Sequence, residues 1–314
     1  PKPQNPKTPK PQCEIRGGAS SLLTSGSNII IKSMETAEKY EVCYIRHAQS
    51  FFNMFIALQR TKSPAELGAT PSEISELSQV ADKFDPKLAD PRLTSKGVAQ
   101  CEAAKSQYHA MPIKVVFVSP LKRAMETAEL LFRGHPMAES IKFVVHPLLS
   151  EMLAGSNEIP CPVSEKIREF GPRGFDFGLF SGYKRPELYF VCNINSPERE
   201  ELLKKIEENE PKVSYIETVC AATKIRRTTY PTHDRKVENY MNLRKRAKEF
   251  ALFVKDYMAK NGLKSGEVAV VAHSTFIGQT TATEFNSYHK GVFTSMENCG
   301  YRMFDVNSLS AAKF

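Results

Sequence analysis

Short, continuous runs of apolar residues alternate with longer amphipathic segments along most of the chain. The runs at 42–45, 115–118, 141–149 and 268–273 have no polar alternation, as expected for strands that are covered on both faces. Residues 301–306 (YRMFDV) form a fifth candidate strand. Because helical segments separate the strands, the pattern predicts a mostly parallel sheet with helices on both faces, a three-layer α/β/α sandwich.

Caps and periodicity predict four helices. The first follows Thr94 as N-cap, and the second has Ser119 as N-cap and Pro120 at its first position and runs through Leu130. The segment 237–258 has apolar residues at three- and four-residue steps, and 197–209 is a shorter amphipathic piece.

The chain divides into a tail, a domain and two insertions. Residues 1–12 (PKPQNPKTPKPQ) have nothing to bury and are predicted to form a disordered or polyproline-like tail. With a Ser/Gly-rich, irregular lead-in, the tail is predicted to span 1–38. The remainder, 39–314, is predicted to be one domain. Two stretches, 54–89 and 155–235, are predicted to be insertions in that domain.

Composition narrows the class of protein. At 314 residues and 41% hydrophobic the chain can bury a large core, and it contains neither an apolar run of membrane-spanning length nor the pattern of a secretory signal. Its 7 cysteines are scattered singly, which predicts reduced thiols in a cytoplasmic protein without structural zinc. The net charge of +8 includes three lysines in the first twelve residues, and no basic run is interleaved with aromatics. We therefore expect neither a nucleic acid nor a membrane as partner.

Two of the predicted strands end in histidine, at His47 and His273, and Arg46 directly precedes the first. Parallel strands bring their carboxyl ends to one edge of the sheet, which is where such folds bind ligands. Arg123 falls in the first turn of a predicted helix, where backbone N–H groups already favour anions. Two arginines, two histidines and a helix N-terminus at one edge predict a phosphate site.

These residues lie in segments that resemble a known family. The segment RHAQSFFN at 46–53 is similar to the RHG-type motif of the histidine phosphatase superfamily, branch 1, the phosphoglycerate-mutase-like proteins. Four further segments resemble that family's motifs in the same order, namely 90–100 (DPRLTSKGVAQ), 119–128 (SPLKRAMETA), 149–151 (LSE) and 270–273 (VVAH). The resemblance implies a phosphoglycerate-mutase-like fold and enzymatic activity as a phosphoric monoester hydrolase.

The resemblance also implies a role for each matching residue. His47 would be the nucleophile that forms a phosphohistidine. The phosphoryl oxygens would be bound by Arg46, Arg123, His273, Asn53, Ser50 and the backbone N–H of Ser274. Glu151 would be the general acid, with Glu158 as the alternative. No metal and no cofactor are implied.

Other residues of the motifs have structural interpretations. Asp90, Thr94, Gly97 and Gln100 are expected to cap and pack a helix beneath the site, and Thr127 to pack or bond within its own helix. The remaining histidines (His109, His135, His146, His233 and His289) have no motif context, and we expect them to lie at the surface or to have their hydrogen bonds satisfied.

The leading functional hypothesis is a metal-independent phosphomonoesterase. The alternatives are a phosphoglycerate-mutase-type phosphotransferase and a weakly active binding or scaffold protein that uses the Pro/Lys-rich tail. The expected partner is a small phosphorylated substrate or a phosphoprotein. The sequence determines neither the natural substrate nor the oligomeric state.

Overall fold

The structure is a computed structural model that describes residues 39–60, 63–194, 198–210, 212–229, 238–285, 291–292 and 296–310. All of these lie in the compact unit that spans Lys39–Phe314. The predicted tail at 1–38, His233 and His289 lie outside the described residues. The division into a tail and one domain with two insertions stays a prediction.

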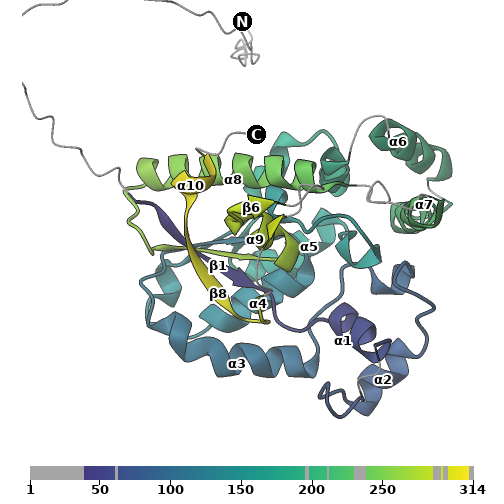
Figure 1. Cartoon of the computed structure of the whole chain (residues 1–314), viewed down its shortest axis with the longest axis horizontal. Coiled ribbons are helices and arrows are strands. Elements are labelled where there is room, and N and C mark those ends of the chain that lie inside the picture. Colours follow the sequence, from purple (N-terminus) through teal and green to yellow (C-terminus); the bar gives the residue numbers. More distant parts are fainter. Residues whose placement is uncertain are drawn as a thin grey trace, which may run out of the picture. The chain divides into compact units, whose positions relative to one another are not determined.

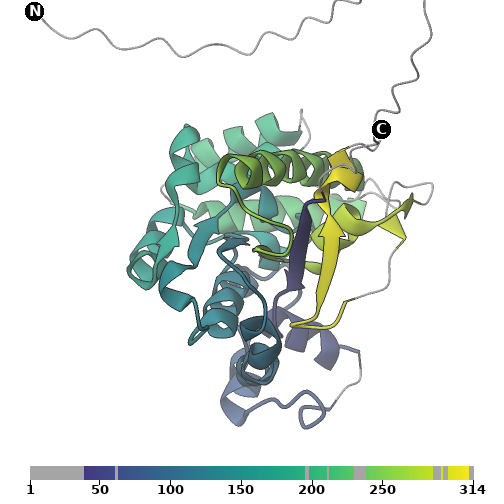
Figure 2. The same cartoon turned by 90° about the vertical axis from the view of Figure 1, so that its left-hand side faces the viewer.

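A six-stranded sheet forms the centre of the described residues, with strand order β4-β3-β2-β5-β1-β8. All neighbouring strands are parallel except β8, which runs antiparallel to β1 (Figure 2). The strands are β1 (Glu41–Arg46), β2 (Val115–Val118), β3 (Lys142–Val145), β4 (Phe175–Asp176), β5 (Val268–Ala272) and β8 (Tyr301–Asp305). A separate two-stranded sheet consists of β6 (Glu284–Phe285) and β7 (Gly291–Val292).

Helices cover both faces of the large sheet, which confirms the predicted three-layer arrangement. The helices α3 (Ser95–His109) and α4 (Lys122–Phe132) lie on one side, and α8 (Tyr240–Lys260) and α10 (Val306–Ser310) lie on the other (Figure 1). Side chains alternate between the two cores. Cys43 and Ile45 of β1 belong to the core on the α3 side, whereas Val42 and Tyr44 belong to the core on the α8 side. Both cores need apolar side chains, so the central strands are continuously apolar.

Both predicted insertions contain more regular structure than the sequence indicated. The first contains α2 (Pro71–Leu77), the 3-10 helix η1 (Pro86–Leu88) and most of α1 (Phe51–Leu58), which begins three residues before the predicted insertion. These helices share a small apolar core. The second contains the predicted amphipathic helix as α6 and two helices that the sequence analysis missed, α5 and α7. These are α5 (Val163–Phe170), α6 (Glu198–Asn209) and α7 (Tyr215–Thr229), with the 3-10 helices η4 (Ser156–Glu158), η5 (Gly171–Arg173), η6 (Gly178–Gly182) and η7 (Pro186–Asn193).

The start of α4 was predicted wrongly. The helix begins at Lys122 instead of Pro120, and Ser119 is not its cap. The reason is a long-range contact, because the carboxylate of Asp90 accepts the Lys122 N–H at 2.7 Å and so caps the helix from another segment. The helix also continues to Phe132, two residues beyond the predicted end.

The predicted strand at 141–149 is also shorter in the structure. It ends at Val145, and residues Pro147–Leu149 form the 3-10 helix η3. The ring nitrogen Nδ1 of His146 accepts the Leu148 N–H at 3.2 Å, and Pro147 has no N–H to extend a ladder. The remaining 3-10 helix is η2 (Ala138–Ser140).

Strand register brings the two predicted active-site histidines together. Arg46 is paired with Ala272, so that His47 and His273 each follow a paired residue at the same edge of the sheet. The His47 N–H donates to the Ala272 carbonyl at 3.0 Å. After His273 the chain turns directly into α9 (Ser274–Thr281). The predicted meeting of both strand ends at one edge is confirmed.

Candidate active site

The hydrogen bonds of His47 leave its ring nitrogen Nε2 without a proton. Its Nδ1 lies 2.7 Å from the Ala48 carbonyl, which only accepts, so Nδ1 carries the proton. Its Nε2 accepts a hydrogen bond from Nε of Arg123 at 3.3 Å. Burial, followed by the charges of Arg123 and Arg46, lowers the pKa of His47 well below its usual value. The neutral ring with an unprotonated Nε2 is the form that can attack an electrophile.

Two arginines act on His47 through their charge, and one of them, Arg123, contacts Nε2. Arg123 is 2% exposed, and its Nη1 donates to the Asn157 carbonyl at 2.6 Å. Arg46 donates from Nη1 to the Met296 carbonyl, while its Nε is buried without a hydrogen-bond partner in the part of the chain that the structure describes. A buried guanidinium N–H without a partner is costly, and an anion would satisfy it.

His273 is buried beside His47, with ring centroids 5.1 Å apart. Its Nε2 lies 2.6 Å from the hydroxyl of Ser119, which explains why Ser119 faces the sheet edge instead of capping α4. Its Nδ1 is buried and has no partner among the described residues. Burial and the neighbouring Arg123 lower the pKa of His273 well below its usual value, so the ring is neutral. If the Ser119 hydroxyl donates to Nε2, the ring proton lies on Nδ1 and is free for a ligand.

Two carboxylates lie near the arginines. Glu151 is half-buried, and its Oε2 accepts the Thr275 N–H at 2.9 Å at the start of α9, two residues from His273. Glu158 is 9% exposed, and its oxygens accept from the N–H groups of Ala154 and Gly155 and from the side chain of Asn157. Burial raises the pKa of Glu158 to about 7, against the opposing effect of Arg123.

The structure brings the other predicted ligands to the start of two helices. Ser50 is the N-cap of α1, where its hydroxyl accepts the Asn53 N–H and donates to Asn53 Oδ1 at 3.2 Å. This reciprocal cap leaves the side-chain nitrogen of Asn53 as the candidate donor and occupies the hydroxyl of Ser50. Ser274 is the first residue of α9 and is half-buried.

The segment at 90–100 caps α3, as the sequence predicted, and it also supports the loop after β1. Thr94 caps α3 and donates from its hydroxyl to Gln49 Oε1 at 2.7 Å, and Gln100 accepts the Gln49 N–H at 2.9 Å. Thr127 bonds to the Arg123 carbonyl within α4 and accepts the Ala48 N–H at 3.0 Å. The loop that carries His47 is therefore held from two helices.

Gly97 is required where α3 passes beneath this loop, because a Cβ on it would lie 2.2 Å from the Gln49 carbonyl oxygen. We expect Gly97→Ala to destabilise the protein by about 3 kcal/mol, the upper end of overpacking costs. Gly182→Ala is the matched control, since nothing lies within 4 Å of its Cβ, and it should be close to neutral. Urea unfolding of both variants measures the difference, and equal stabilities would contradict the predicted clash.

His146 also follows a strand but is not part of the site. It packs against Phe250 and Phe253, with ring centroids 5.0 and 4.5 Å away, and its Nδ1 caps η3. Burial lowers the pKa of His146 to about 3. We expected His146 to lie at the surface or to have its hydrogen bonds satisfied, and the structure shows it buried, with Nδ1 accepting the Leu148 N–H.

This low pKa predicts a loss of stability in acid. The native protein keeps His146 neutral, whereas the unfolded chain binds a proton below about pH 6.5, so this contribution is lost as pH falls from 6.5 toward 3. His146→Asn keeps an acceptor for Leu148 but does not titrate. The difference in unfolding free energy between the wild type and this variant should shrink by about 2 kcal/mol between pH 8 and pH 5, as measured by urea unfolding. A constant difference would contradict the assignment.

A buried ion pair behind the site was missed. Arg246 of α8 donates to Glu238 Oε1 at 2.7 Å, and its Nη1 donates to the carbonyls of Leu148 and Ser150, both at 2.6 Å. Glu238 in turn accepts the Leu153 N–H at 3.2 Å. The Arg246–Glu238 pair therefore binds the backbone both before and after Glu151. Its signal was present in the sequence, since a charged residue at 246 interrupts the apolar stripe of Leu243, Ala247 and Phe250.

The segment 298–300 supports Arg46 and His47 from the side of β8. The side chain of Asn298 donates to the His47 carbonyl at 2.6 Å, and Cys299 N–H donates to the Arg46 carbonyl at 3.1 Å. Cys299 has a positive φ of 58°, and Arg46 N–H donates to the Gly300 carbonyl at 3.0 Å. These bonds hold Arg46, the last residue of β1, against the segment that leads into β8.

The described residues contain neither the side-chain cluster of a metal site nor a membrane-spanning helix. They contain no group of three or more His, Cys, Asp or Glu side chains arranged to hold a metal ion. None of their helices is both long enough and apolar enough to cross a bilayer.

Part of the chain that includes Arg123 matches a protein-family model. The family model described as the histidine phosphatase superfamily (branch 1) matches residues 85–170. The matched range includes Asp90, Arg123, Glu151 and Glu158, while His47 and His273 lie outside it. The resemblance of the chain to this superfamily is thereby confirmed over that segment.

Solved structures of three proteins with related names are similar to the chain. A phosphoglycerate mutase from Bacillus anthracis strain Sterne is 19% identical, with a TM-score of 0.42, and the match covers 87% of this chain and 97% of that one. The ecdysone phosphate phosphatase of Bombyx mori is 14% identical, with a TM-score of 0.46 and coverages of 84% and 88%. A mycobacterial glucosyl-3-phosphoglycerate phosphatase is 15% identical, with a TM-score of 0.43 and coverages of 84% and 90%. Similarity at this level does not indicate a shared substrate. No curated protein matches the chain.

Proposed function

We propose that the protein is a phosphomonoester hydrolase that works through a phosphohistidine on His47. The observation that carries this proposal is the pairing of a deprotonated His47 Nε2 with the buried guanidinium of Arg123. A neutral nucleophile beside a buried positive charge suits attack on a negatively charged phosphoryl group.

In the first step, Nε2 of His47 forms a bond to phosphorus while the bond from phosphorus to the ester oxygen breaks. Arg46, Arg123 and His273 bind the other phosphoryl oxygens, with Asn53 and the Ser274 N–H as further donors. The unpartnered N–H of Arg46 and Nδ1 of His273 support this assignment. Charge stabilisation of this kind is most of what phosphoryl transfer requires.

A carboxyl group must protonate the leaving oxygen in this step. In the second step it takes a proton from water, whose oxygen attacks phosphorus and releases inorganic phosphate and neutral His47. We assign this role to Glu151, because it is half-buried and lies at the start of α9 beside His273. Glu158 is the alternative, although three hydrogen-bond donors already hold its carboxylate within the 154–158 loop.

The two carboxyls can be distinguished by the leaving group. Glu151→Gln should slow hydrolysis of an alkyl phosphate by about 10²-fold or more, since alkoxides need a proton to leave. Hydrolysis of 4-nitrophenyl phosphate should fall much less, because nitrophenolate leaves without a proton. If Glu158→Gln shows this selective loss and Glu151→Gln does not, the assignment is reversed.

A mutase-type phosphotransferase is the second candidate. One observation favours it, namely that His47 is 5% exposed and therefore shielded from water. Such an enzyme passes the phosphoryl group from His47 to an acceptor hydroxyl instead of to water.

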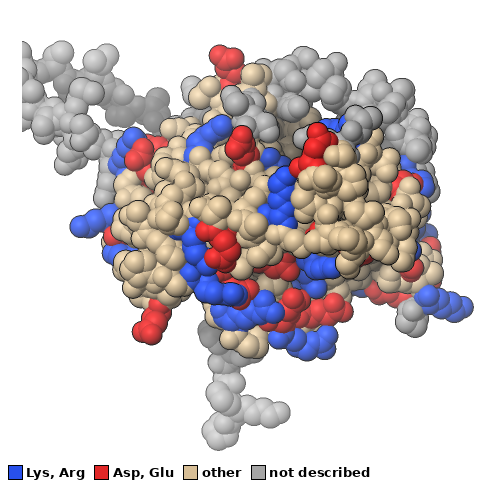
Figure 3. Space-filling view, turned by 90° about the horizontal axis from the view of Figure 1, so that it is seen from below, with Lys and Arg blue, Asp and Glu red and all other residues tan. Residues whose placement is uncertain are grey.

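The partner we propose is a small phosphorylated substrate or a phosphoprotein. On the side of the molecule that Figure 3 shows, basic and acidic side chains are interspersed. This side therefore offers no continuous basic face along which a nucleic acid could bind. A cytoplasmic location stays a proposal, supported by the six free cysteines among the described residues.

The test is a hydrolysis screen over sugar phosphates, phosphoglycerates, nucleotides and phosphopeptides, without added metal. Release of inorganic phosphate from at least one of them supports the proposal, and no release from any would contradict it. Repeating the screen with added acceptor alcohols separates the candidates, since a phosphotransferase yields a new ester in place of phosphate.

A further inference from the structure

A buried ion pair lies directly behind the arginine that faces His47. Nζ of Lys166 lies 2.5 Å from Oδ2 of Asp90, and both side chains are 0% exposed. Lys166 belongs to α5 in the second insertion, at the centre of a buried stripe with Val163 and Phe170. A lysine at such a position needs partners to balance the cost of burial.

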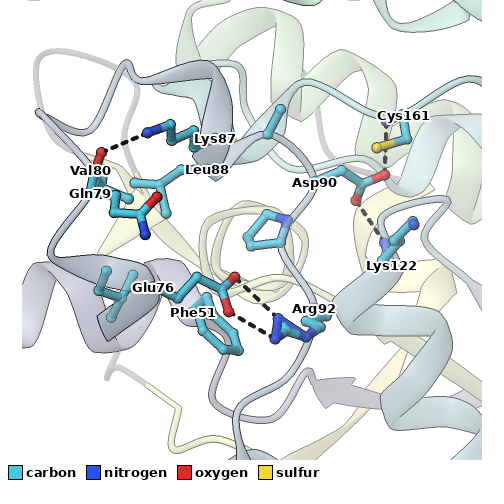
Figure 4. Close-up of a pocket in the computed structure, with 13 residues that line it drawn as sticks. Phe51, Glu76, Gln79, Val80, Lys87, Leu88, Asp90, Arg92, Lys122 and Cys161 are labelled. Atoms are coloured by element: carbon cyan, nitrogen blue, oxygen red, sulfur yellow. Dashed lines mark hydrogen bonds and ion pairs between the residues drawn. The ribbon is translucent and has the colours of Figure 1, made fainter. Parts of the chain in front are cut away.

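Asp90 connects this lysine to the start of α4. Its Oδ1 accepts the Lys122 N–H at 2.7 Å, and its Oδ2 accepts the Cys161 N–H at 2.9 Å (Figure 4). Asp90 has a positive φ of 44°, a backbone conformation that a non-glycine residue adopts at a cost. The carboxylate thus caps the helix that presents Arg123 at its second residue.

Lys166 makes a second contact with the same turn, because its Nζ donates to the Pro120 carbonyl at 2.6 Å. A nearby ion pair between Lys122 and Glu169, at 3.1 Å, also joins α5 to α4. The start of α4 is therefore fixed on both sides of Leu121 by groups from outside the helix.

The pair also fixes the second partner of Arg123. The guanidinium donates to the Asn157 carbonyl, and the chain from Asn157 reaches Cys161, whose N–H is bound by Asp90. Both anchors of the guanidinium, its own helix and the loop it binds, thus converge on one carboxylate. Figure 4 shows this carboxylate between Lys122 and Cys161, at one end of a cavity of about 410 Å³.

We propose that the Asp90–Lys166 ion pair positions Arg123 against His47 and so sets the affinity of the site for phosphate. Neither residue touches the reacting atoms, so both are positioning residues. The effect on phosphate affinity rests on the proposed function. The effect on the distance between Arg123 and His47 does not, so it can be tested separately.

Without the lysine, Asp90 would be a buried charge without its cation, and the start of α4 would shift to expose it to water. Arg123 would then move away from Nε2 of His47. Two effects should follow, because the nearby positive charge both lowers the pKa of His47 and binds phosphate. The pKa of His47 should rise, and phosphate should bind more weakly.

The test uses Lys166→Met in the full chain, with Lys114→Met as the matched control. Lys114 forms a similarly short but more exposed ion pair with Glu267, at 2.6 Å, and it precedes β2 at the opposite edge of the sheet. Titration of the isotope-labelled histidine rings by NMR gives the pKa of His47, and calorimetry gives the dissociation constant of inorganic phosphate.

We expect Lys166→Met to raise the phosphate dissociation constant about tenfold to a hundredfold, as loss of one charge-assisted hydrogen bond would. The pKa of His47 should rise in the same variant, and the KM for a hydrolysed substrate should increase more than kcat falls. Lys166→Arg should restore part of the affinity. Lys114→Met should change none of these quantities.

A folded Lys166→Met that matches the control in both His47 pKa and phosphate affinity would overturn the proposal. If that variant does not fold, Asp90→Asn/Lys166→Met decides, since it buries no unpaired charge. Oδ1 and Oδ2 of Asp90 each accept one backbone N–H, and in asparagine one of these oxygens is replaced by an NH2 group, which faces the Lys122 or Cys161 N–H as a second donor. A double variant whose His47 pKa and phosphate affinity equal those of the wild type would also overturn the proposal. A wild type that neither binds nor releases phosphate contradicts the proposed function instead, while the His47 pKa still tests the positioning.

Discussion

Replacing His47 by alanine is expected to reduce phosphatase activity by at least about 10⁴-fold, because the variant has no nitrogen to accept the phosphoryl group. Arg46, the buried Arg123 and His273 should remain in place, so phosphate should still bind. The expected pattern is therefore a loss in kcat with a small change in phosphate affinity. Steady-state kinetics and calorimetry on the same preparation measure both.

The matched control for this substitution is His109→Ala. His109 is a half-buried histidine of α3 whose Nε2 bonds to the Leu131 carbonyl, away from both strand ends. It should keep wild-type kinetics. Activity that survives in His47→Ala at more than a few per cent would show that another group attacks phosphorus.

Replacing Arg246 by methionine is expected to destabilise the protein by about 3–5 kcal/mol, since it leaves Glu238 as a buried charge without its partner. Side-chain exposure of the pair is 4% for Arg246 and 1% for Glu238. The carbonyls of Leu148 and Ser150 would lose their donors as well. Denaturant unfolding measures the change.

An exposed pair with the same shortest N···O distance provides the control. Arg133 lies 2.7 Å from Glu129, the same distance as in the Arg246–Glu238 pair, but its side chain is 60% exposed. Arg133→Met should change the unfolding free energy by less than about 1 kcal/mol, since water screens such pairs. If both substitutions cost the same, burial does not determine the strength of these pairs. Glu238→Gln/Arg246→Met should recover part of the loss, because it removes the unpaired charge.

The sheet and its histidine edge could be predicted from the sequence because they depend on local patterns. Continuous apolar runs require strands covered on both faces, and parallel strands align their carboxyl ends, which places Arg46, His47 and His273 together. The first turn of α4 placed Arg123 at the same edge, although the exact start of the helix was wrong.

The groups that hold the site could not be predicted, because they depend on contacts between distant segments. Asp90 caps α4 across 32 residues, Lys166 comes from an insertion with a mixed pattern, and the Asn157 carbonyl carries no sequence signal at all. Ser119 was interpreted as a cap because its local sequence fits one. In the structure its hydroxyl binds His273 instead.

The choice between Glu151 and Glu158 depends on the same kind of contact. Both residues follow η3 within ten positions, and spacing alone does not distinguish them. Their partners in the structure differ, since Glu151 contacts the start of α9 beside His273 while Glu158 closes its own loop, and our proposal of Glu151 rests on this difference.

The most direct test of the central claim is to trap the phosphoenzyme. The enzyme is mixed with a substrate labelled in its phosphoryl group, quenched in alkali, where phosphohistidine is stable, and digested for peptide mapping. The account predicts label on the peptide that contains His47, on the ring nitrogen Nε2, and its loss on brief acid treatment. Turnover without label on this peptide, or label on another residue, would contradict it.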